Sequence, residues 1–257
     1  MINHDQGAHT LIARRGNSLP LAILQARMSS TRLPGKVLAD LAGLPMILRQ
    51  IERLKRSTRL NGIVVATSDQ SSDDPLAVCL IAAGVPVFRG SLDDVLDRYM
   101  GAIEAFGPVR TVVRLTADCP LADPELIDQT LALHLRSGAD YTSNTPARRS
   151  YAKGLDVEVF EAVALRVAAA ETRDPYDHEH VTPFLYRNPK RFKVEGLEQA
   201  ADEGEVRWTV DRPDDLDFVR AVYDQLYAVN PAFTSDDVRA LVAGRPDLAH
   251  LGGDRRI

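Results

Sequence analysis

The sequence has few of the residues from which disulfide frameworks, zinc sites and membrane spans are built. It holds two cysteines in 257 residues, Cys79 and Cys119, which are far apart and have no CxxC spacing. This count and spacing indicate neither a zinc site nor a disulfide framework. No apolar run approaches the length of a spanning helix, and the polar opening MINHDQGAHT lacks the charged-then-apolar order of a signal peptide. We therefore expect a cytoplasmic protein without a membrane partner.

Positive net charge and several nucleotide and metal motifs are also missing. The formal net charge is −5, which argues against a general nucleic-acid binder. The chain has neither the GxxxxGKS/T loop of Walker-type ATPases nor the GxGxxG dinucleotide fingerprint. His178 and His180 are two residues apart, so they do not form the HExxH motif of metalloproteases, and on a helix they would point apart.

The most informative stretch runs from Leu21 to Leu38, LAILQARMSSTRLPGKVL. Its first four residues predict a buried strand, and a loop rich in hydroxyls and cations follows. The polar side chains of this loop are Arg27, Ser29, Ser30, Thr31, Arg32 and Lys36. Backbone N–H groups, side-chain donors and positive charge in one loop suit a triphosphate. An ordinary solvated loop between a strand and a helix is the simpler interpretation.

Predicted strands and helices alternate from residue 21 to residue 138. The strands are 21–24, 62–67, 85–88 and 109–115, and the helices are 45–54, 75–83, one capped by Ser91, and one from Pro124 to Gly138. The alternation predicts right-handed βαβ units and a parallel sheet covered by helices on both faces. The loops near Arg27, Ser68, Ala117 and Asp211 would then gather at the carboxyl ends of strands, where such sheets bind ligands.

The alternation weakens after residue 145. Further strands are predicted at 139–142, 154–160, 192–194 and 206–210, and further helices at 161–170, 213–228 and 235–242, the last one capped by Ser235. We expect one domain of residues 19–257, with a mixed, mainly parallel sheet and a small inserted lobe at about 144–200. Residues 1–18 have no periodicity and are predicted to be a flexible tail.

Two aspartates that follow predicted strands are candidates for a metal site. Asp118 comes after the strand 109–115, and Asp211 after the strand 206–210. Carboxylates at such an edge suit a hard divalent cation such as Mg²⁺, and one ion can link them if they lie within about 8 Å of each other. Without a cation the two carboxylates would repel, and one of them would have to be protonated or find a cationic partner. A turn-forming aspartate at 118 and a helix-entry carboxylate at 211 are the simpler interpretations.

Five segments together resemble a known family. They are QARMSSTRLPGK, DDVLDRY, LTADCPL, GLDVEVF and EHVTPF, and they resemble the sugar-acid cytidylyltransferases of the acylneuraminate and 3-deoxy-manno-octulosonate types. The spore-coat-polysaccharide branch is the nearest, since better-known members have a proline where this chain has Gln25. The resemblance implies a Rossmann-like three-layer α/β/α nucleotidyltransferase core. It also implies a reaction of CTP with an acidic sugar or related acid that yields a CMP conjugate and pyrophosphate.

The resemblance further implies roles for individual residues. The catalytic residues would be Arg27, Lys36, Asp118 and Asp211, and the last two would hold Mg²⁺. The nucleotide would contact Gln25, Ala26, Arg27, Ser30, Arg32, Lys36, Ser68, Arg89 and Asp118. The acidic acceptor would contact Arg114, Asn144, Asp156, Glu158, Glu179 and His180. The simpler interpretations are an ion pair for Arg114, a capped turn for Asn144 and surface positions for the histidines.

Oligomeric state and two other functions stay open at this point. The strand 154–160 could pair across the axis of a homodimer, which is the expected assembly. A glycosyltransferase on the same core, using a nucleotide sugar, is the alternative enzyme. It normally needs an Asp-x-Asp metal motif, and the literal match here, Asp215-Leu216-Asp217, lies inside a predicted helix. A nucleotide-sensing or scaffold protein with this fold is a third interpretation.

Overall fold

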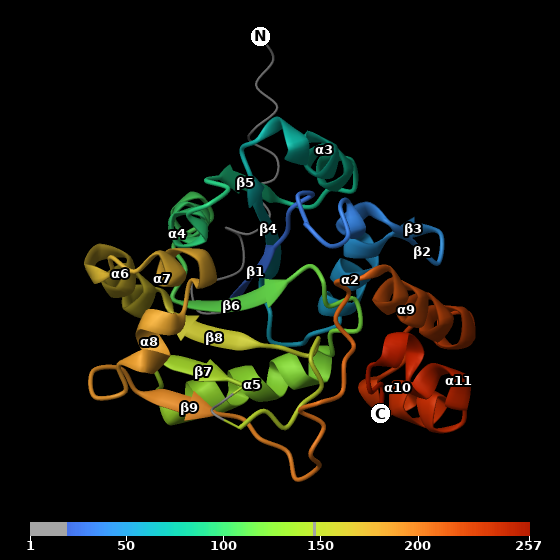
Figure 1. Cartoon of the computed structure of the whole chain (residues 1–257). Coiled ribbons are helices and arrows are strands. Elements are labelled where there is room, and N and C mark those ends of the chain that lie inside the picture. Colours follow the sequence, from blue (N-terminus) through green and yellow to red (C-terminus); the bar gives the residue numbers. More distant parts are fainter. Residues whose placement is uncertain (1–19, 146–147) are drawn as a thin grey trace.

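The computed structural model of the protein describes residues 20–145 and 148–257, so the predicted tail at 1–18 lies outside the described residues. Its main strands are β1 Leu21–Gln25, β4 Gly62–Ser68, β5 Val87–Gly90, β6 Thr111–Thr116, β7 Tyr141–Ser143, β8 Glu158–Glu161 and β9 Val194–Gly196. They form one sheet in the order β5-β4-β1-β6-β8-β7-β9 (Figure 1). Strands β1, β4, β5 and β6 are parallel, whereas β8 runs antiparallel to β6 and β7. The predicted mixed, mainly parallel sheet is therefore confirmed.

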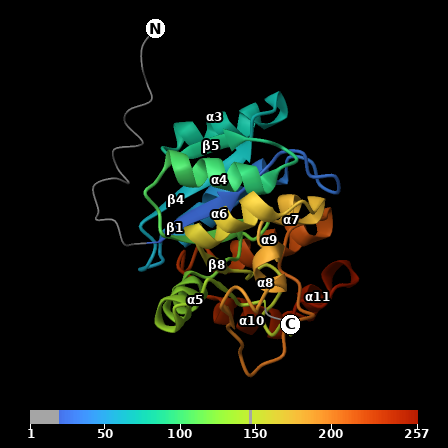
Figure 2. The ribbon, with the colours of Figure 1, turned by 90° about the vertical axis from the view of Figure 1, so that its left-hand side faces the viewer.

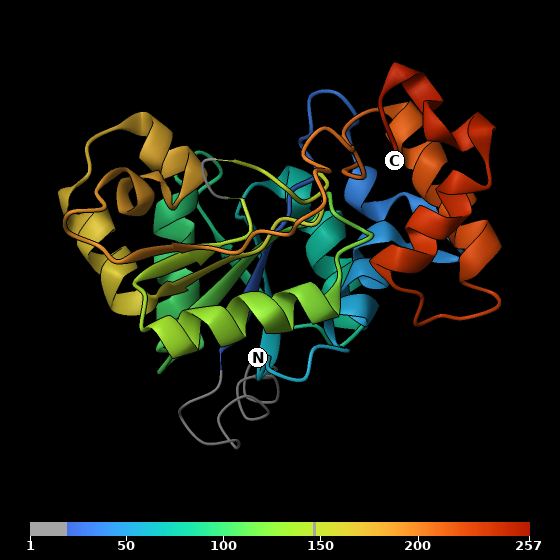
Figure 3. The ribbon, with the colours of Figure 1, turned by 90° about the horizontal axis from the view of Figure 1, so that it is seen from below.

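Helices cover both faces of this sheet. They are α2 Met46–Leu54, α3 Asp74–Ala82, α4 Val95–Ala105, α5 Pro124–Ser137, α6 Ala162–Glu171, α7 Pro175–His180, α8 Pro183–Arg187, α9 Pro213–Leu226, α10 Ser235–Ala243 and α11 Pro246–Ala249. Helices α4, α6, α7 and α8 lie together on one side, and α2, α9, α10 and α11 lie on the other (Figures 1 and 3). Figure 2 shows α4, α6 and α7 in front of the sheet. Within the described ranges, every helix is too short or too polar to cross a bilayer.

The alternation of side chains along β1 explains the two helical layers. Ala22 and Leu24 belong to the core cluster that contains residues of α2, α5 and α9. Leu21 and Ile23 belong to a second cluster, formed with α4 and α6 on the opposite face. A strand that is apolar on both faces needs a helical layer on each side. This arrangement confirms the Rossmann-like three-layer core.

Four element predictions need correction. The segment 206–210 is extended, but it joins no ladder and makes one isolated bridge, between Lys153 and Arg207. Strand β8 begins at Glu158, later than predicted, and pairs with β6 and β7 along its two edges, so it cannot also pair across a dimer axis. Helix α4 begins after Asp94, which accepts the N–H of Asp97, while the Ser91 hydroxyl accepts the N–H of Asp94 outside the helix. Thr234 rather than a serine caps α10.

Candidate active site

A cavity of about 660 Å³ lies beyond the carboxyl ends of β1 and β6. It brings together most of the residues selected from the sequence: Gln25, Ala26, Arg27, Ser30, Arg32, Lys36, Arg114, Asp118, Glu179, His180 and Asp211. The parallel pairing of β1 with β6 explains this meeting, because Gln25 is in register with Thr116. The loops that follow these two residues therefore leave the sheet side by side.

The loop after β1 is fixed by a few internal contacts. The Met28 carbonyl accepts the N–H groups of Ser30 and Gly35, each at 2.9 Å. Gly35 has φ of 72°, in the left-handed region that a residue with a side chain adopts at a cost. The Met28 N–H donates to the Asp73 carboxylate at 2.8 Å. Asp73 therefore ties the cationic loop to the chain that follows β4, a role that sequence reasoning missed.

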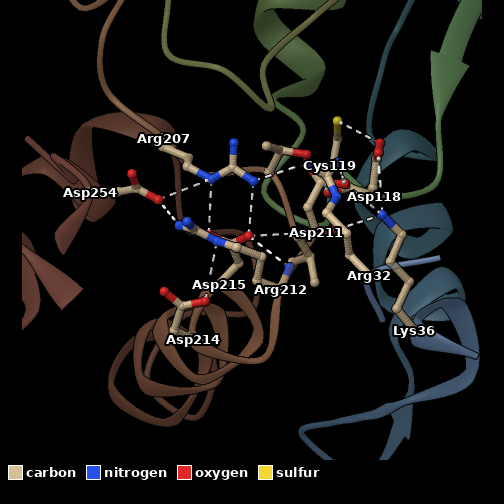
Figure 4. A network of polar contacts seen from close by, with 12 residues as sticks. Arg32, Lys36, Asp118, Cys119, Arg207, Asp211, Arg212, Asp214, Asp215 and Asp254 are labelled. Atoms are coloured by element: carbon tan, nitrogen blue, oxygen red, sulfur yellow. Dashed lines mark hydrogen bonds and ion pairs between the residues drawn. The ribbon is translucent and has the colours of Figure 1, made fainter. Parts of the chain in front are cut away.

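Lys36 sits between the two candidate metal ligands (Figure 4). Its ammonium donates to the Val210 carbonyl at 2.6 Å and to Asp211 Oδ1 at 3.0 Å, and it lies 3.5 Å from Asp118 Oδ2. Its side chain is only 9% exposed. The Asp118 and Asp211 carboxylates thus both contact the ammonium nitrogen of Lys36. Their distances to this nitrogen place the two carboxylates within the 8 Å limit for ligands of one shared ion. The expected meeting of Asp118 and Asp211 is therefore observed.

Asp211 is surrounded by positive charge. Lys36 and Arg32 reach its Oδ1 atom, each at 3.0 Å, and Arg207 reaches Oδ2 at 2.9 Å. Burial acts to raise the pKa of Asp211, but Lys36, Arg207 and Arg32 outweigh it and hold that pKa below its ordinary value. The two aspartates therefore do not repel each other without a metal, because these cations stand between and around them. Of the two expected ways to relieve the repulsion, protonation of one carboxylate or a cationic partner, the structure has the second.

Asp118 is held far more loosely than Asp211. Its Oδ1 accepts from the Cys119 thiol at 3.4 Å, and its Oδ2 has the long contact with Lys36. Burial, with help from Asp118, raises the pKa of the Cys119 thiol well above its usual value, so Cys119 is a neutral thiol and a poor nucleophile. The Asp118 side chain is 29% exposed and lines the cavity.

The carboxylate oxygens of Asp118 and Asp211 can supply part of the coordination that a hard divalent cation needs. Asp118 is available, and Asp211 can offer Oδ1 once Lys36 or Arg32 turns away, since Oδ2 is committed to Arg207. Among the described residues, no group of three or more His, Cys, Asp or Glu side chains could hold a metal ion. Mg²⁺ commonly uses one or two carboxylates and takes its other oxygens from water and phosphates. The pair is therefore suited to Mg²⁺ that arrives with a nucleotide.

Arg98 is a buried cation at the other end of the cavity. Its side chain is almost fully buried, its Nη1 donates to the Ser91 carbonyl at 2.7 Å, and its Nε has no hydrogen-bond partner within the described part of the chain. Leu92, Asp93 and Val95 line the cavity beside it. The sequence placed Arg98 only in the motif DDVLDRY. The signal that could have identified Arg98 is its position: a charged residue on the buried face of α4, one turn from Val95 and next to Tyr99.

A second cavity of about 520 Å³ opens beside the first, and Arg114 and His180 line both. Three tyrosines, Tyr141, Tyr176 and Tyr186, contribute to its wall. Arg114 pairs with Glu158 at 2.7 Å, and its Nε is buried without a partner within the described ranges. Burial opposes the charge of Arg114, but Glu158 outweighs it and raises the pKa of the guanidinium.

His180 is held at the junction by an unusual turn. Val181, which follows it, has φ of 74° and ψ of −55°, and the Thr182 N–H donates to the His180 carbonyl at 2.9 Å. These angles and this bond define a γ-turn, which is rare and strained for a β-branched residue. The Thr182 hydroxyl then donates to Glu158 at 2.6 Å, so the turn connects α7 to the wall of the second cavity.

Four predicted contact residues, Ser68, Arg89, Asn144 and Asp156, line neither cavity. Ser68 is fully buried, and its hydroxyl donates to Asp73. Arg89 donates to the Ser68 and Gln70 carbonyls and pairs with Asp74. Asn144 is also fully buried, and its amide bonds Leu155 and Val157 of the backbone. These three residues support loops instead of facing a ligand, because their polar atoms are already used.

Asp156 pairs with Arg149 and lines neither cavity. Glu158, by contrast, lines the second cavity, where both of its carboxylate oxygens are bonded, one to Arg114 and one to Thr182. The Asp215-Leu216-Asp217 match to a glycosyltransferase motif also fails. Asp215 is fully buried on α9 and is bonded to Arg207 and Arg256.

Comparison with known proteins identifies the family. A family model described as cytidylyltransferase matches residues 21–230. The spore coat polysaccharide biosynthesis protein SpsF of Bacillus subtilis is 36% identical over 241 residues, covering 89% of this chain and 96% of that protein. A 3-deoxy-manno-octulosonate cytidylyltransferase of Anaeromyxobacter dehalogenans is 29% identical over 235 residues, covering 78% of this chain and 96% of that protein.

A solved cytidylyltransferase of Leptospira borgpetersenii has a similar structure. It superposes with a TM-score of 0.83 at 29% identity, covering 91% of this chain and 97% of that one. These matches confirm the family resemblance that the five sequence segments indicated. The chain belongs to the cytidylyltransferase family of nucleotidyltransferases.

Proposed function

We propose that this enzyme transfers CMP from CTP to an acidic sugar or a related acid and releases pyrophosphate. The single observation that carries the proposal is the pairing of two joined cavities. One has a cationic loop facing two carboxylates, and the other opens from it at Arg114 and His180. Family membership and the names of the relatives supply the nucleotide and the class of acceptor.

The loop after β1 would bind the triphosphate. Arg27, Ser30 and Arg32 line the cavity and can donate to phosphate oxygens. Lys36 already uses three acceptors, so it would exchange one of them for a phosphate oxygen. Arg98, whose Nε has no partner among the described residues, would donate to the carbonyl of the pyrimidine base, because a buried N–H group without an acceptor is unfavourable.

In the proposed reaction, an acceptor hydroxyl gives its proton to solvent water and its oxygen attacks the α-phosphorus in line, while the bond from the α-phosphorus to the bridging oxygen of the β-phosphate breaks and pyrophosphate leaves. Asp118 and Asp211 would hold Mg²⁺, and the bound ion would supply Lewis-acid polarisation of a phosphate and offset its charge. Arg27, Arg32 and Lys36 would stabilise the charge that gathers on the leaving pyrophosphate. The acid would bind in the second cavity, which Arg114 and His180 line together with the first cavity, while Glu179 lines the first cavity next to His180.

Assembly and location complete the proposal. CTP is made in the cytoplasm, so we propose a cytoplasmic enzyme. We also propose a homodimer whose interface lies elsewhere than β8, since both edges of β8 are already paired. Light scattering on the purified protein measures the assembly.

The test is pyrophosphate release with each of the four nucleoside triphosphates, Mg²⁺ and a panel of sugar acids. CTP with at least one acid should give product, and CTP should raise the melting temperature more than ATP, GTP or UTP. A ligand at 100 times its Kd stabilises by about 2.7 kcal/mol, which such a screen detects readily. A clear preference for a purine triphosphate would refute the assignment of cytidylyl transfer and leave the fold intact.

A further inference from the structure

The residues 254–257, here called the arm, lie beyond the part of the chain that the family model matches, which ends at residue 230. After α11 the chain turns back from the outer helices toward the segment 206–212, which carries Asp211 (Figures 1 and 3). Arg256 of the arm is fully buried. Its guanidinium lies over the Phe218 ring, 4.8 Å from the ring centre.

The arm holds both backbone groups of Arg207. The Arg207 N–H donates to the Arg255 carbonyl at 2.8 Å, and the Arg256 guanidinium donates to the Arg207 carbonyl at 2.8 Å. The Trp208 indole adds a bond to the Arg256 carbonyl, also at 2.8 Å. Because the segment 206–210 joins no sheet ladder, its path depends on these bonds, on the bridge to Lys153 and on the bonds of Val210 to the Asp118 carbonyl and the Lys36 ammonium.

The side chain of Arg207 then connects the arm to Asp211 (Figure 4). Its Nη2 donates to Asp211 Oδ2 and to Asp215 Oδ2, each at 2.9 Å. Asp215 is fully buried and also accepts from Arg256 at 3.1 Å and from the N–H of Asp211 at 2.9 Å. Asp254 of the arm lies 3.4 Å from Arg207 Nε. Arg207 is thus bound by the arm at its backbone and by Asp211 and Asp215 at its side chain.

We propose that the arm is a positioning element for Asp211, with Arg256 and Arg207 as the positioning residues. The inference rests on the proposed function, in which Lys36 and Arg32 turn toward a triphosphate. Arg207 is then the one cation, of the three described around Asp211, that still contacts the Asp211 carboxylate. It comes from the opposite side to the cationic loop, holds Oδ2, and leaves Oδ1 directed at the cavity. The orientation of the metal-binding oxygen therefore depends on residues that contact neither substrate.

The test compares variants of the full-length protein by Mn²⁺ binding in the presence of CTP, measured by calorimetry, and by kcat and KM for CTP. Arg256→Met keeps much of the side-chain volume and removes its four side-chain hydrogen bonds, which end on the Arg207 and Leu251 carbonyls and on Asp215. It should weaken Mn²⁺ binding by at least about tenfold, as for other residues that orient metal ligands. Arg256→Lys should restore part of this loss. Arg255→Gln is the matched control and should equal the wild type, because the Arg255 side chain is exposed and bonds only the Ile257 carbonyl among the described residues.

Since Arg256 is buried, Asp254→Asn provides a milder second variant at a side chain that is 33% exposed. It should shift Mn²⁺ binding in the same direction by a smaller factor, and it decides the question if Arg256→Met does not fold. Wild-type Mn²⁺ binding in a folded variant, even one with a lower melting temperature, would overturn the inference and leave the arm a purely structural element. If Asp118→Asn does not change Mn²⁺ binding by the parent protein, the proposed metal site fails instead.

Discussion

Replacing Asp211 by asparagine should destabilise the protein in the absence of any ligand. The carboxylate has three cationic partners at 3.0 Å or less, and its side chain is 16% exposed. An asparagine keeps one acceptor oxygen, loses the charge and directs an N–H₂ group at one of the cations. Hydrogen bonds to charged groups contribute about 1.5–3 kcal/mol each. Allowing for solvent screening at a partly exposed site, we expect the free energy of unfolding to fall by about 2 kcal/mol.

Asp118→Asn is the matched comparison. Asp118 has one ion pair, at 3.5 Å, and is more exposed than Asp211. Its replacement should change stability by less than about 0.5 kcal/mol, as for most partly exposed pairs. Both variants should nevertheless lose most turnover, because both residues serve the same proposed ion. The double variant should turn over substrate at a rate close to that of either single variant.

Urea unfolding at several pH values measures this difference. The midpoint of Asp211→Asn should fall with an unchanged m value, and its melting temperature should fall by roughly 4–8 °C. Because the folded pKa of Asp211 is lowered, its contribution is present above its unfolded pKa, near 3.9. It is lost as the pH falls below that value, so wild type and variant should converge in acid. Equal or higher stability of Asp211→Asn at pH 7 would show that the surrounding cations do not stabilise the fold.

Three further changes test other contacts of the site. Lys36→Ala should lower turnover by at least one to two powers of ten and, because it also removes the bond to the Val210 carbonyl, should lower the urea midpoint. Wild-type turnover by Lys36→Ala would contradict the proposed role of Lys36 in binding the triphosphate. His180→Ala should raise KM for the acid far more than KM for CTP, and an equal rise in both would place His180 in the nucleotide site. Asp73→Asn should lower both stability and CTP affinity at pH 7, because Asp73 anchors the Met28 N–H. The folded pKa of Asp73 is lowered, so the stability difference should narrow as the pH falls below about 4, and unchanged CTP affinity at pH 7 would contradict the anchoring role.

The sequence was sufficient to predict the centre of the fold and the edge of the sheet at which the site lies. Four short apolar runs separated by helical patterns imply parallel strands, and the ends of parallel strands meet at one edge. This reasoning brought Arg27 and Asp118 together correctly. It could not tell which way a side chain points from that edge. Ser68 also ends a strand, but its hydroxyl turns inward to Asp73.

Partners that come from distant segments explain most of the remaining errors. The residues next to Asn144 in the sequence do not indicate a hydrogen-bond partner for its side chain. In the fold, the Asn144 amide is hydrogen-bonded to the backbone of residues 155–157, which lies next to it. The alternating residues 206–210 predicted a strand, since periodicity reports burial and not hydrogen-bond partners. Their partners include Lys153, the arm and, at Val210, Asp118 and Lys36, and no local pattern indicates any of these contacts.

Asp211 therefore lies where it was predicted to lie, but it is placed there by contacts that the sequence pattern does not indicate. We expected it to end a strand of the sheet, but it follows an irregular segment whose Val210 N–H donates to the Asp118 carbonyl at 2.8 Å. Lys36 in turn donates to the Val210 carbonyl at 2.6 Å. These bonds join Asp118, Lys36 and Asp211 through the backbone as well as through their charges. The geometry of the aspartate pair is thus set by contacts with Val210, and a substitution that disturbs the backbone there should act on both carboxylates at once.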